Sequence, residues 1–297
     1  MSDLASLPTE SRNPASEHLD ELPTLEMLQV IQAADQEALT AVQRVLPTVA
    51  AAVDAVAECL GNGGRLFYIG AGTSGRLGVL DASECPPTYN TTPEMVQGII
   101  AGGDGALRRS MERAEDEPEG GRRDLEQRGF SKKDALVGIA ASGRTPYVLG
   151  GIEFARSLGA LTIGLTCVPG SPIATSAQIG ITADTGPEVV TGSTRMKAGT
   201  ATKLVLNMLS TGVLVRLGYV YGNLMVNVQP TNTKLVDRAR RIIASIAEVS
   251  YDEASRLLAE AGSVRTAILM HKRNLSRVDA EARLAAAKGR LRVALGE

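Results

Sequence analysis

The chain has 297 residues, of which 44% are apolar and 22% charged, and its formal net charge is −2. This length supports a sizeable core in one or two domains, and the balanced charge argues against nucleic acid or an anionic membrane as a partner. Aromatic residues are only 3% and Trp is absent, so the stacking surfaces that bind bases or polysaccharides are scarce.

Cysteine and histidine chemistry is limited. The three cysteines, Cys59, Cys85 and Cys167, form no CxxC pair, so we expect buried thiols in a reducing, cytoplasmic compartment. His18 and His271 lie near opposite ends of the chain, which predicts neither a zinc site nor a Ser-His-Asp triad. Residues 1–20 lack the apolar core of a signal peptide, and no run has the length of a membrane-spanning helix.

The N-terminal part, residues 1–60, is predicted to be an arm followed by helices. Residues 1–23 have the composition of an extended arm. Apolar residues at helical spacing then predict two helices between Thr24 and Leu60, with Pro47 early in the second. The run 61–64, GNGG, ends the helical pattern.

Residues 61–230 alternate strands and helices. We expect strands at 65–70, 95–101, 135–140, 161–166 and 179–183, with helices at 75–85, 104–115, 119–128 and 146–158. This alternation predicts an α/β fold, a parallel sheet covered by helices on both faces, with a ligand at the carboxyl ends of the strands. A long apolar helix at 196–217 is expected to be buried or at a subunit interface.

Residues 231–297 are predicted to form a small helical bundle. Ser250 with Glu253 makes a capping box, Ser263 can cap a second helix, and Ser276 with Asp279 marks a third start.

Two loops carry the same pattern, GAGTSGR at 70–76 and AASGRT at 140–145, each after an apolar strand and before a helix. Such a turn directs backbone N–H groups, a hydroxyl and the positive end of a helix dipole at one point, which suits a phosphate. Two such loops predict one small phosphorylated ligand, held by Thr73, Ser74, Ser142, Arg144 and Thr145.

The first loop also satisfies GxGxxG, the dinucleotide fingerprint. That fingerprint needs an acidic residue at the end of the next strand for the ribose. The next strand ends instead in Gly102 and Gly103, so a nicotinamide dehydrogenase is a weak alternative.

A third polar segment, 190–203, opens the long apolar helix with many hydroxyl and cationic side chains. Among these we select Ser193, Thr194 and Lys197 as further ligand-binding candidates. An ordinary helix cap would need only one of the two hydroxyl groups.

Two carboxylates lie near predicted helix ends. Glu84 precedes Cys85-Pro86-Pro87, where the prolines are expected to end a helix, and Glu115 lies in a charged run. The pattern alone does not distinguish either from a surface carboxylate.

Several long motifs in one order resemble the N-acetylmuramic acid 6-phosphate etherase family of sugar isomerase (SIS) phosphosugar-binding proteins. They are TESRNP at 9–14, GAGTSGR at 70–76, LDASECPPT at 80–88, IAGG at 100–103, AED at 114–116, ASGRTPY at 141–147 and GSTRMKAGT at 192–200. The resemblance extends nearly end to end.

The resemblance implies cleavage of the ether that joins D-lactate to C3 of a phosphosugar in cell-wall recycling, by a homodimer with no metal and no organic cofactor. By position, Glu84 matches the family's proton donor and Glu115 its second catalytic carboxylate. One base and one acid suit ring opening, C2 deprotonation, elimination and water addition.

Two other functions use similar residues. A non-catalytic phosphosugar sensor would need the same loops without the carboxylates, and an aldose-ketose isomerase would need no acid at C3. A straight helix would also carry Glu84 about 15 Å from Ser74. Either that helix bends or ends early near Gly78, or Glu84 serves a site across a dimer interface.

Overall fold

Five short apolar runs form one parallel sheet, in a computed structural model that describes residues 7–109, 111–230 and 232–297. The strands are β1 (Leu66–Gly70), β2 (Val96–Ile100), β3 (Ala135–Ile139), β4 (Leu161–Thr166) and β5 (Ile179–Thr182). Their order is β2-β1-β3-β4-β5, and all neighbours are parallel. The five predicted strands and the α/β fold class are confirmed.

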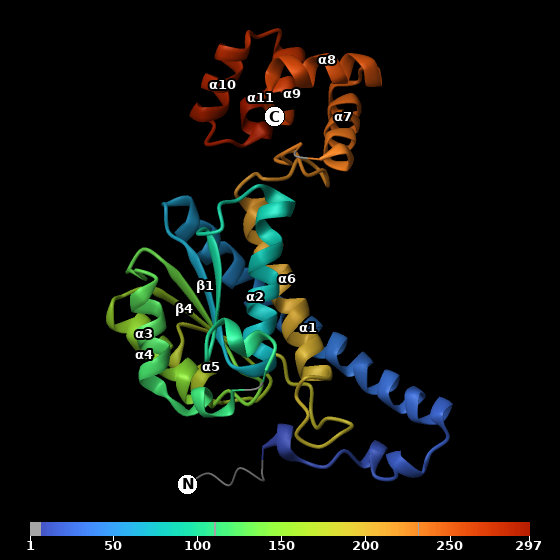
Figure 1. The fold of residues 1–297 in the computed structure, drawn as a ribbon, viewed down its shortest axis with the longest axis vertical. Coiled ribbons are helices and arrows are strands. Elements are labelled where there is room, and N and C mark those ends of the chain that lie inside the picture. The colour runs from blue at the N-terminus through green and yellow to red at the C-terminus, as the bar shows by residue number, and fades with distance from the viewer. Residues whose placement is uncertain (1–6, 110, 231) are drawn as a thin grey trace. The chain divides into compact units, whose positions relative to one another are not determined.

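The sheet belongs to the first of two compact units, which comprises Met1–Ser83 and Pro93–Ser210 (Figure 1). One face is covered by α3 (Pro118–Gln127), α4 (Pro146–Ser157) and α5 (Pro172–Ser176), and the other by α1 (Thr24–Gly61), α2 (Gly72–Tyr89) and α6 (Lys197–Arg216) (Figure 1). The first of these faces buries an apolar cluster that includes Phe67, Ile69, Leu125, Leu136 and Ile152. Helices on both faces explain why β1 and β3 are buried at every position.

The N-terminal helix is longer than predicted. Residues 24–61 form α1 without a break, with Pro47 inside it, so the prediction of two helices is wrong. Buried residues recur along its length, among them Ala38, Val42, Val49 and Val56. Continuous packing of this face stabilises one helix across a proline that local propensity would place at a helix start.

The segment between β2 and α3 contains two short 3-10 helices, Asp104–Leu107 and Glu112–Asp116, in place of the single helix predicted at 104–115. Gly102 and Gly103 enter it with φ of +86° and +69°, and Gly105 is a poor helix former. The carbonyls of Ala106 and Leu107 accept hydrogen bonds from the Arg76 side chain instead of continuing a helix.

Helix α2 continues through Pro86 and Pro87 to Tyr89, so neither an end at the prolines nor an early end near Gly78 occurs. The last turn of α2 is held by other hydrogen bonds. The N–H of Asn90 donates to Pro86 O over 2.8 Å, and Asn227 Nδ2 donates to Tyr89 O over 2.6 Å. Asn90 then ends the helix with φ of +55°.

The second compact unit comprises Glu84–Thr92 and Thr211–Glu297. It contains the predicted bundle, formed by α7 (Thr233–Ala247), α8 (Tyr251–Ala261), α9 (Val264–Arg273), α10 (Arg277–Ala286) and α11 (Leu291–Leu295). The three predicted caps are confirmed, because Ser250, Ser263 and Ser276 each accept a backbone N–H three residues later.

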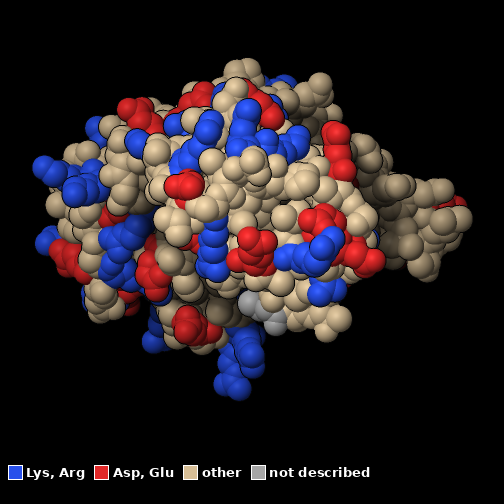
Figure 2. All heavy atoms as spheres, turned by 90° about the horizontal axis from the view of Figure 1, so that it is seen from above, with Lys and Arg blue, Asp and Glu red and all other residues tan. Residues whose placement is uncertain are grey.

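Two described helices, α1 and α6, are long and apolar enough to cross a membrane by length and composition, contrary to the expectation from sequence. The core helix of a soluble protein passes the same test, and 56% of the apolar window of α6 is buried inside the structure. In α1, Glu37 and Arg44 form polar contacts with residues of the same unit. Figure 2 shows Lys and Arg interspersed with Asp and Glu on the face it presents, in keeping with the small net charge.

Candidate active site

The first loop is a tight turn between β1 and α2. A Cβ on Gly75 would lie 2.6 Å from Gly70 O, and a Cβ on Gly70 would lie 2.7 Å from Gly75 N, so neither position accepts a side chain. Gly72 adopts φ of +51°, which favours glycine. These glycines bring the first turn of α2, with Thr73 and Ser74, directly against the end of β1.

The second loop depends on Gly143, which has φ of +67°. A Cβ there would lie 2.1 Å from Ser171 Oγ, and the Gly143 carbonyl accepts the N–H of Ile173 over 2.9 Å. The hydroxyl of Ser142 accepts the N–H of Arg144 over 3.4 Å. The loop is therefore fixed against the segment that follows β4.

The two loops leave the sheet side by side. Gly70, the last residue of β1, is the register partner of Ile139, the last residue of β3. The order β2-β1-β3 makes the boundary between β1 and β3 the topological switch point, where ligands of open α/β sheets bind. The duplicated motif thus occupies the place where this fold forms its ligand crevice.

Glu115 joins this crevice through Thr145. The Thr145 hydroxyl donates to Glu115 Oε1 over 3.0 Å. Glu115 also lines a small cavity of about 30 Å³ together with Gly72 and Arg76 of the first loop and Met111. The structure therefore brings the first loop, the second loop and one of the two selected carboxylates together.

The third polar segment touches the first loop. A Cβ on Gly199 would lie 3.6 Å from Thr73 Cγ2, so the start of α6 packs close to Thr73. Ser193 and Thr194 lie in the turn before α6, where the Met196 N–H donates to Ser193 O over 3.2 Å. Both are partly exposed.

The N-terminus of α6 already holds an anion of the chain itself. The Glu188 carboxylate accepts the N–H groups of Lys197 and Ala198 over 3.1 and 3.0 Å. Burial raises the pKa of Glu188, and these two hydrogen bonds oppose that shift. Sequence reasoning missed Glu188, because it lies nine residues before the helix start, outside the usual cap positions.

Lys197 does not line the cavity. Its side chain is 1% exposed, and its ammonium group pairs with Glu37 on α1. The ammonium group of Lys197 is therefore already paired within the protein. The other two candidates of this segment, Ser193 and Thr194, lie in the turn before α6 and are partly exposed.

Glu84 is assigned to a different compact unit from these residues. It is exposed on α2 and belongs to the second compact unit, whereas Ser74, Glu115 and Thr145 belong to the first. Because α2 is unbroken, ten helical residues separate Glu84 from Ser74 by about 15 Å along the axis.

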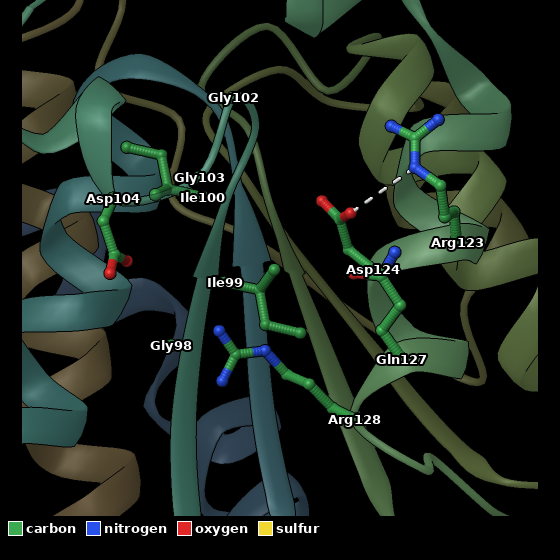
Figure 3. Close-up of a pocket in the computed structure, with 10 residues that line it drawn as sticks. All are labelled: Gly98, Ile99, Ile100, Gly102, Gly103, Asp104, Arg123, Asp124, Gln127 and Arg128. Atoms are coloured by element: carbon green, nitrogen blue, oxygen red, sulfur yellow. Dashed lines mark ion pairs between the residues drawn. The ribbon is translucent and has the colours of Figure 1, made fainter.

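A larger cavity, about 380 Å³, lies beside the edge strand β2 and α3 (Figure 3). Three of its charged side chains, Arg123, Asp124 and Arg128, have partners within the protein. Arg123 Nε lies 3.9 Å from Asp124 Oδ1, the Tyr147 hydroxyl donates to Asp124 over 2.6 Å, and Arg128 donates to Gln97. It contains none of the predicted site residues, so the loop crevice is the better candidate.

Nucleophilic thiol chemistry has little support. Burial raises the pKa of Cys59 to about 11 and that of Cys167 to about 12, so the thiolate is rare at neutral pH. Within the described residues, no group of three or more His, Cys, Asp or Glu is placed to hold a metal ion.

The fold and the paired serine loops define a phosphosugar-binding protein of the SIS class. Residues 48–156 match the glucokinase regulatory protein N-terminal SIS domain, and residues 128–212 match the SIS domain. A crystal structure from Bacteroides fragilis, described as a candidate phosphosugar isomerase involved in capsule formation, has the same fold. It is 20% identical with a TM-score of 0.51, covering 66% of this chain and 94% of that chain.

Within that class the chain belongs to the N-acetylmuramic acid 6-phosphate etherase family. It is 55% identical to the N-acetylmuramic acid 6-phosphate etherase of Aeromonas hydrophila, over 97% of this chain and 97% of the relative. It is 54% identical to N-acetylmuramic acid 6-phosphate etherase 1 of Vibrio cholerae, over 99% of each chain. Identity at this level over the whole length confirms the family predicted from the motifs.

Proposed function

We propose that this protein is a carbon–oxygen lyase that cleaves the C3 lactyl ether of N-acetylmuramic acid 6-phosphate, giving N-acetylglucosamine 6-phosphate and D-lactate. It would act in the cytoplasm, in the recycling of cell-wall sugars. The observation that carries the proposal is the position of Glu115, a carboxylate in the cavity that the first serine loop also lines. The full-length similarity to etherases supports the same activity.

The chemistry explains why two carboxyl groups are needed. An unactivated ether has a poor leaving group, so direct displacement is unfavourable. Ring opening converts C1 to an aldehyde and makes the C2 proton acidic. A carboxylate removes that proton, lactate leaves from C3 with a proton from a carboxylic acid, and water adds to C3 of the unsaturated aldehyde.

We assign the base at C2 to Glu115 and the acid at C3 to Glu84. Thr145 supports the first assignment, because its hydroxyl fixes one Glu115 oxygen and leaves the other for the substrate. The assignment of Glu84 depends on the family motif at 80–88.

The C6 phosphate is proposed to bind at the switch point, held by the hydroxyl groups of Ser74 and Ser142 and the N–H groups at the start of α2. Thr73, Arg144, Ser193 and Thr194 would complete the substrate contacts. Binding energy from the remote phosphate orients the reacting carbons. All of these residues lie in the segment 61–230, to which we assign the chemistry.

We further propose a homodimer with shared sites. The first unit exposes large apolar side chains on α1, α2 and α6, which a second subunit would cover: Leu25, Leu28, Leu39, Leu46, Leu80 and Met208. In such a dimer, Glu84 of one subunit would act in the site of the other, which accounts for its separation from Ser74 along an unbroken helix.

The direct test is incubation with N-acetylmuramic acid 6-phosphate and enzymatic detection of D-lactate, with Glu115→Gln as a matched control. We expect lactate from the wild type, little from the variant, and little from the unphosphorylated sugar. Tight binding of the phosphosugar without lactate release would instead identify a sensor.

A further inference from the structure

Arg76 connects the first loop to the segment that carries Glu115. It is the last residue of the first loop, the proposed phosphate loop, and lies in the second turn of α2. Its Nε donates to Leu107 O over 3.1 Å, and its Nη2 donates to Ala106 O over 2.8 Å. A planar guanidinium can serve two adjacent carbonyls at once, which a lysine ammonium does less well.

The segment that Arg76 holds has little regular structure of its own. Between Asp104 and Asp116 the described backbone forms two short 3-10 helices. Side-chain hydrogen bonds tie the described part of this segment to other elements, two from Arg76 and one from Thr145 to Glu115. Short 3-10 helices have poor hydrogen-bond geometry, so their placement depends on such external contacts.

Arg76 also shares a cavity with the residues it would position. Gly72 of the phosphate loop, Arg76, Ala106, Met111 and Glu115 all line the same small space. A shift of the 104–116 segment would therefore move the Glu115 carboxylate relative to the loop that holds the substrate.

We propose that Arg76 is a positioning residue for the base. It couples the first turn of α2, where the substrate phosphate would bind, to the placement of Glu115, so that an occupied phosphate loop also fixes the catalytic carboxylate. This inference rests on the proposed function, since it concerns the same site. It assigns Arg76 no contact with the substrate.

The test compares Arg76→Met and Arg76→Lys with a control arginine. Arg156→Met is the matched control, because Arg156 also donates to a backbone carbonyl, that of Ser176 over 2.7 Å, on the exposed end of α4. A small misplacement of a catalytic group can reduce turnover about 10²-fold. We expect a loss of that order in kcat for Arg76→Met, a smaller loss for Arg76→Lys and none for Arg156→Met.

Binding separates positioning from substrate contact. The affinity for the product N-acetylglucosamine 6-phosphate, measured by calorimetry, is expected to match that of wild type in Arg76→Met, because the phosphate hydrogen bonds of the serine loops remain. A loss of affinity as large as that of Ser74→Ala, or an unchanged kcat, would overturn the proposal. If Arg76→Met does not fold, the same comparison is made with Arg76→Lys.

Hydrogen exchange gives a readout that does not need turnover. The phosphosugar product is expected to slow amide exchange over 104–109 and 111–116 in the wild type, and to slow it less in Arg76→Met. Equal protection in both proteins would contradict the coupling. A wild type that shows this protection but releases no lactate would disprove the proposed function and leave the coupling intact.

Discussion

The hydroxyl of Thr145 donates to Oε1 of Glu115 over 3.0 Å, and so joins two segments that are 30 residues apart in the chain. Thr145 is 5% exposed and precedes the first turn of α4, although its side chain makes no cap hydrogen bond there. Its hydroxyl is directed to the carboxylate. The sequence predicted Thr145 as a substrate ligand, and from this contact we propose that it also orients Glu115.

Removal of this hydroxyl tests that role. Thr145→Val keeps the shape of the side chain and loses the donor, so the carboxylate is no longer held and kcat is expected to fall about tenfold or more. Thr145→Ser retains a hydroxyl and should restore most of the activity. Steady-state lactate release measures both variants. Equal activity in Thr145→Val and the wild type would show that the hydrogen bond has no catalytic consequence.

The polar groups around the loops are expected to differ in their effect on binding. Ser142→Ala and Ser74→Ala each remove a hydroxyl that we propose binds the phosphate, and should weaken phosphosugar binding by roughly 0.5–1.5 kcal/mol or more. Lys197→Met should change that affinity little, because the ammonium of Lys197 is paired with Glu37. Calorimetry with N-acetylglucosamine 6-phosphate compares the three. A larger loss of affinity in Lys197→Met than in Ser142→Ala would indicate that Lys197 contacts the ligand.

The sheet was predictable because its strands are apolar runs bounded by turn residues, a local signal that burial on both faces makes strong. The duplicated Ser-Gly loops were predictable for a similar reason, since a strand that leads into a helix through glycines fixes where the ligand end lies. Helix ends were less predictable. Pro47 and Pro86 predicted breaks that tertiary packing and the Asn227 side chain overcome.

Long-range pairing accounts for what the sequence could not reveal. The partners of Lys197 and Glu115 are 160 and 30 residues away, so no local pattern indicates them. Glu188 occupies the helix N-terminus that the sequence assigned to a ligand. In each case the fold, and not the local sequence, sets the partner of the residue.

A buried carboxylate outside the site gives a pH-dependent stability. Asp81 is 5% exposed and accepts hydrogen bonds from Tyr68, Asn207 and Ser210. Burial raises its pKa above the ordinary value of 3.8, and the three hydrogen bonds oppose that shift. The folded state therefore binds this proton more tightly than the unfolded state, and the stability contributed by Asp81 is lost as the pH rises through its raised pKa.

Asp81→Asn cannot titrate, so it should lack this loss. We expect the free energy of unfolding of the variant minus that of the wild type to become more positive between about pH 4 and about pH 7, measured by urea denaturation. The test uses the change of this free-energy difference with pH. Its sign at any one pH is not used, because the substitution also changes the hydrogen bonds of residue 81. A difference that becomes more negative with rising pH would contradict the raised pKa.

Shared sites in a homodimer predict complementation between inactive variants. When Glu84→Gln and Glu115→Gln are mixed and allowed to exchange subunits, a heterodimer carries one site with both substitutions and one with neither. Random exchange should therefore restore about a quarter of wild-type activity. No recovery after verified exchange would place both carboxylates of a site in the same subunit.

Variants of the two carboxylates should also be blocked at different steps of the reaction. With Glu115 as the base at C2, Glu115→Gln should neither release lactate nor exchange the C2 proton with solvent. Glu84→Gln should still exchange that proton, because deprotonation precedes departure of the lactyl group, while releasing lactate roughly 10²- to 10⁴-fold more slowly. Reactions in deuterated water, with label at C2 of recovered substrate followed alongside lactate, distinguish the two. Exchange in Glu115→Gln with none in Glu84→Gln would reverse the roles, and full activity in both variants would remove both carboxylates from the mechanism.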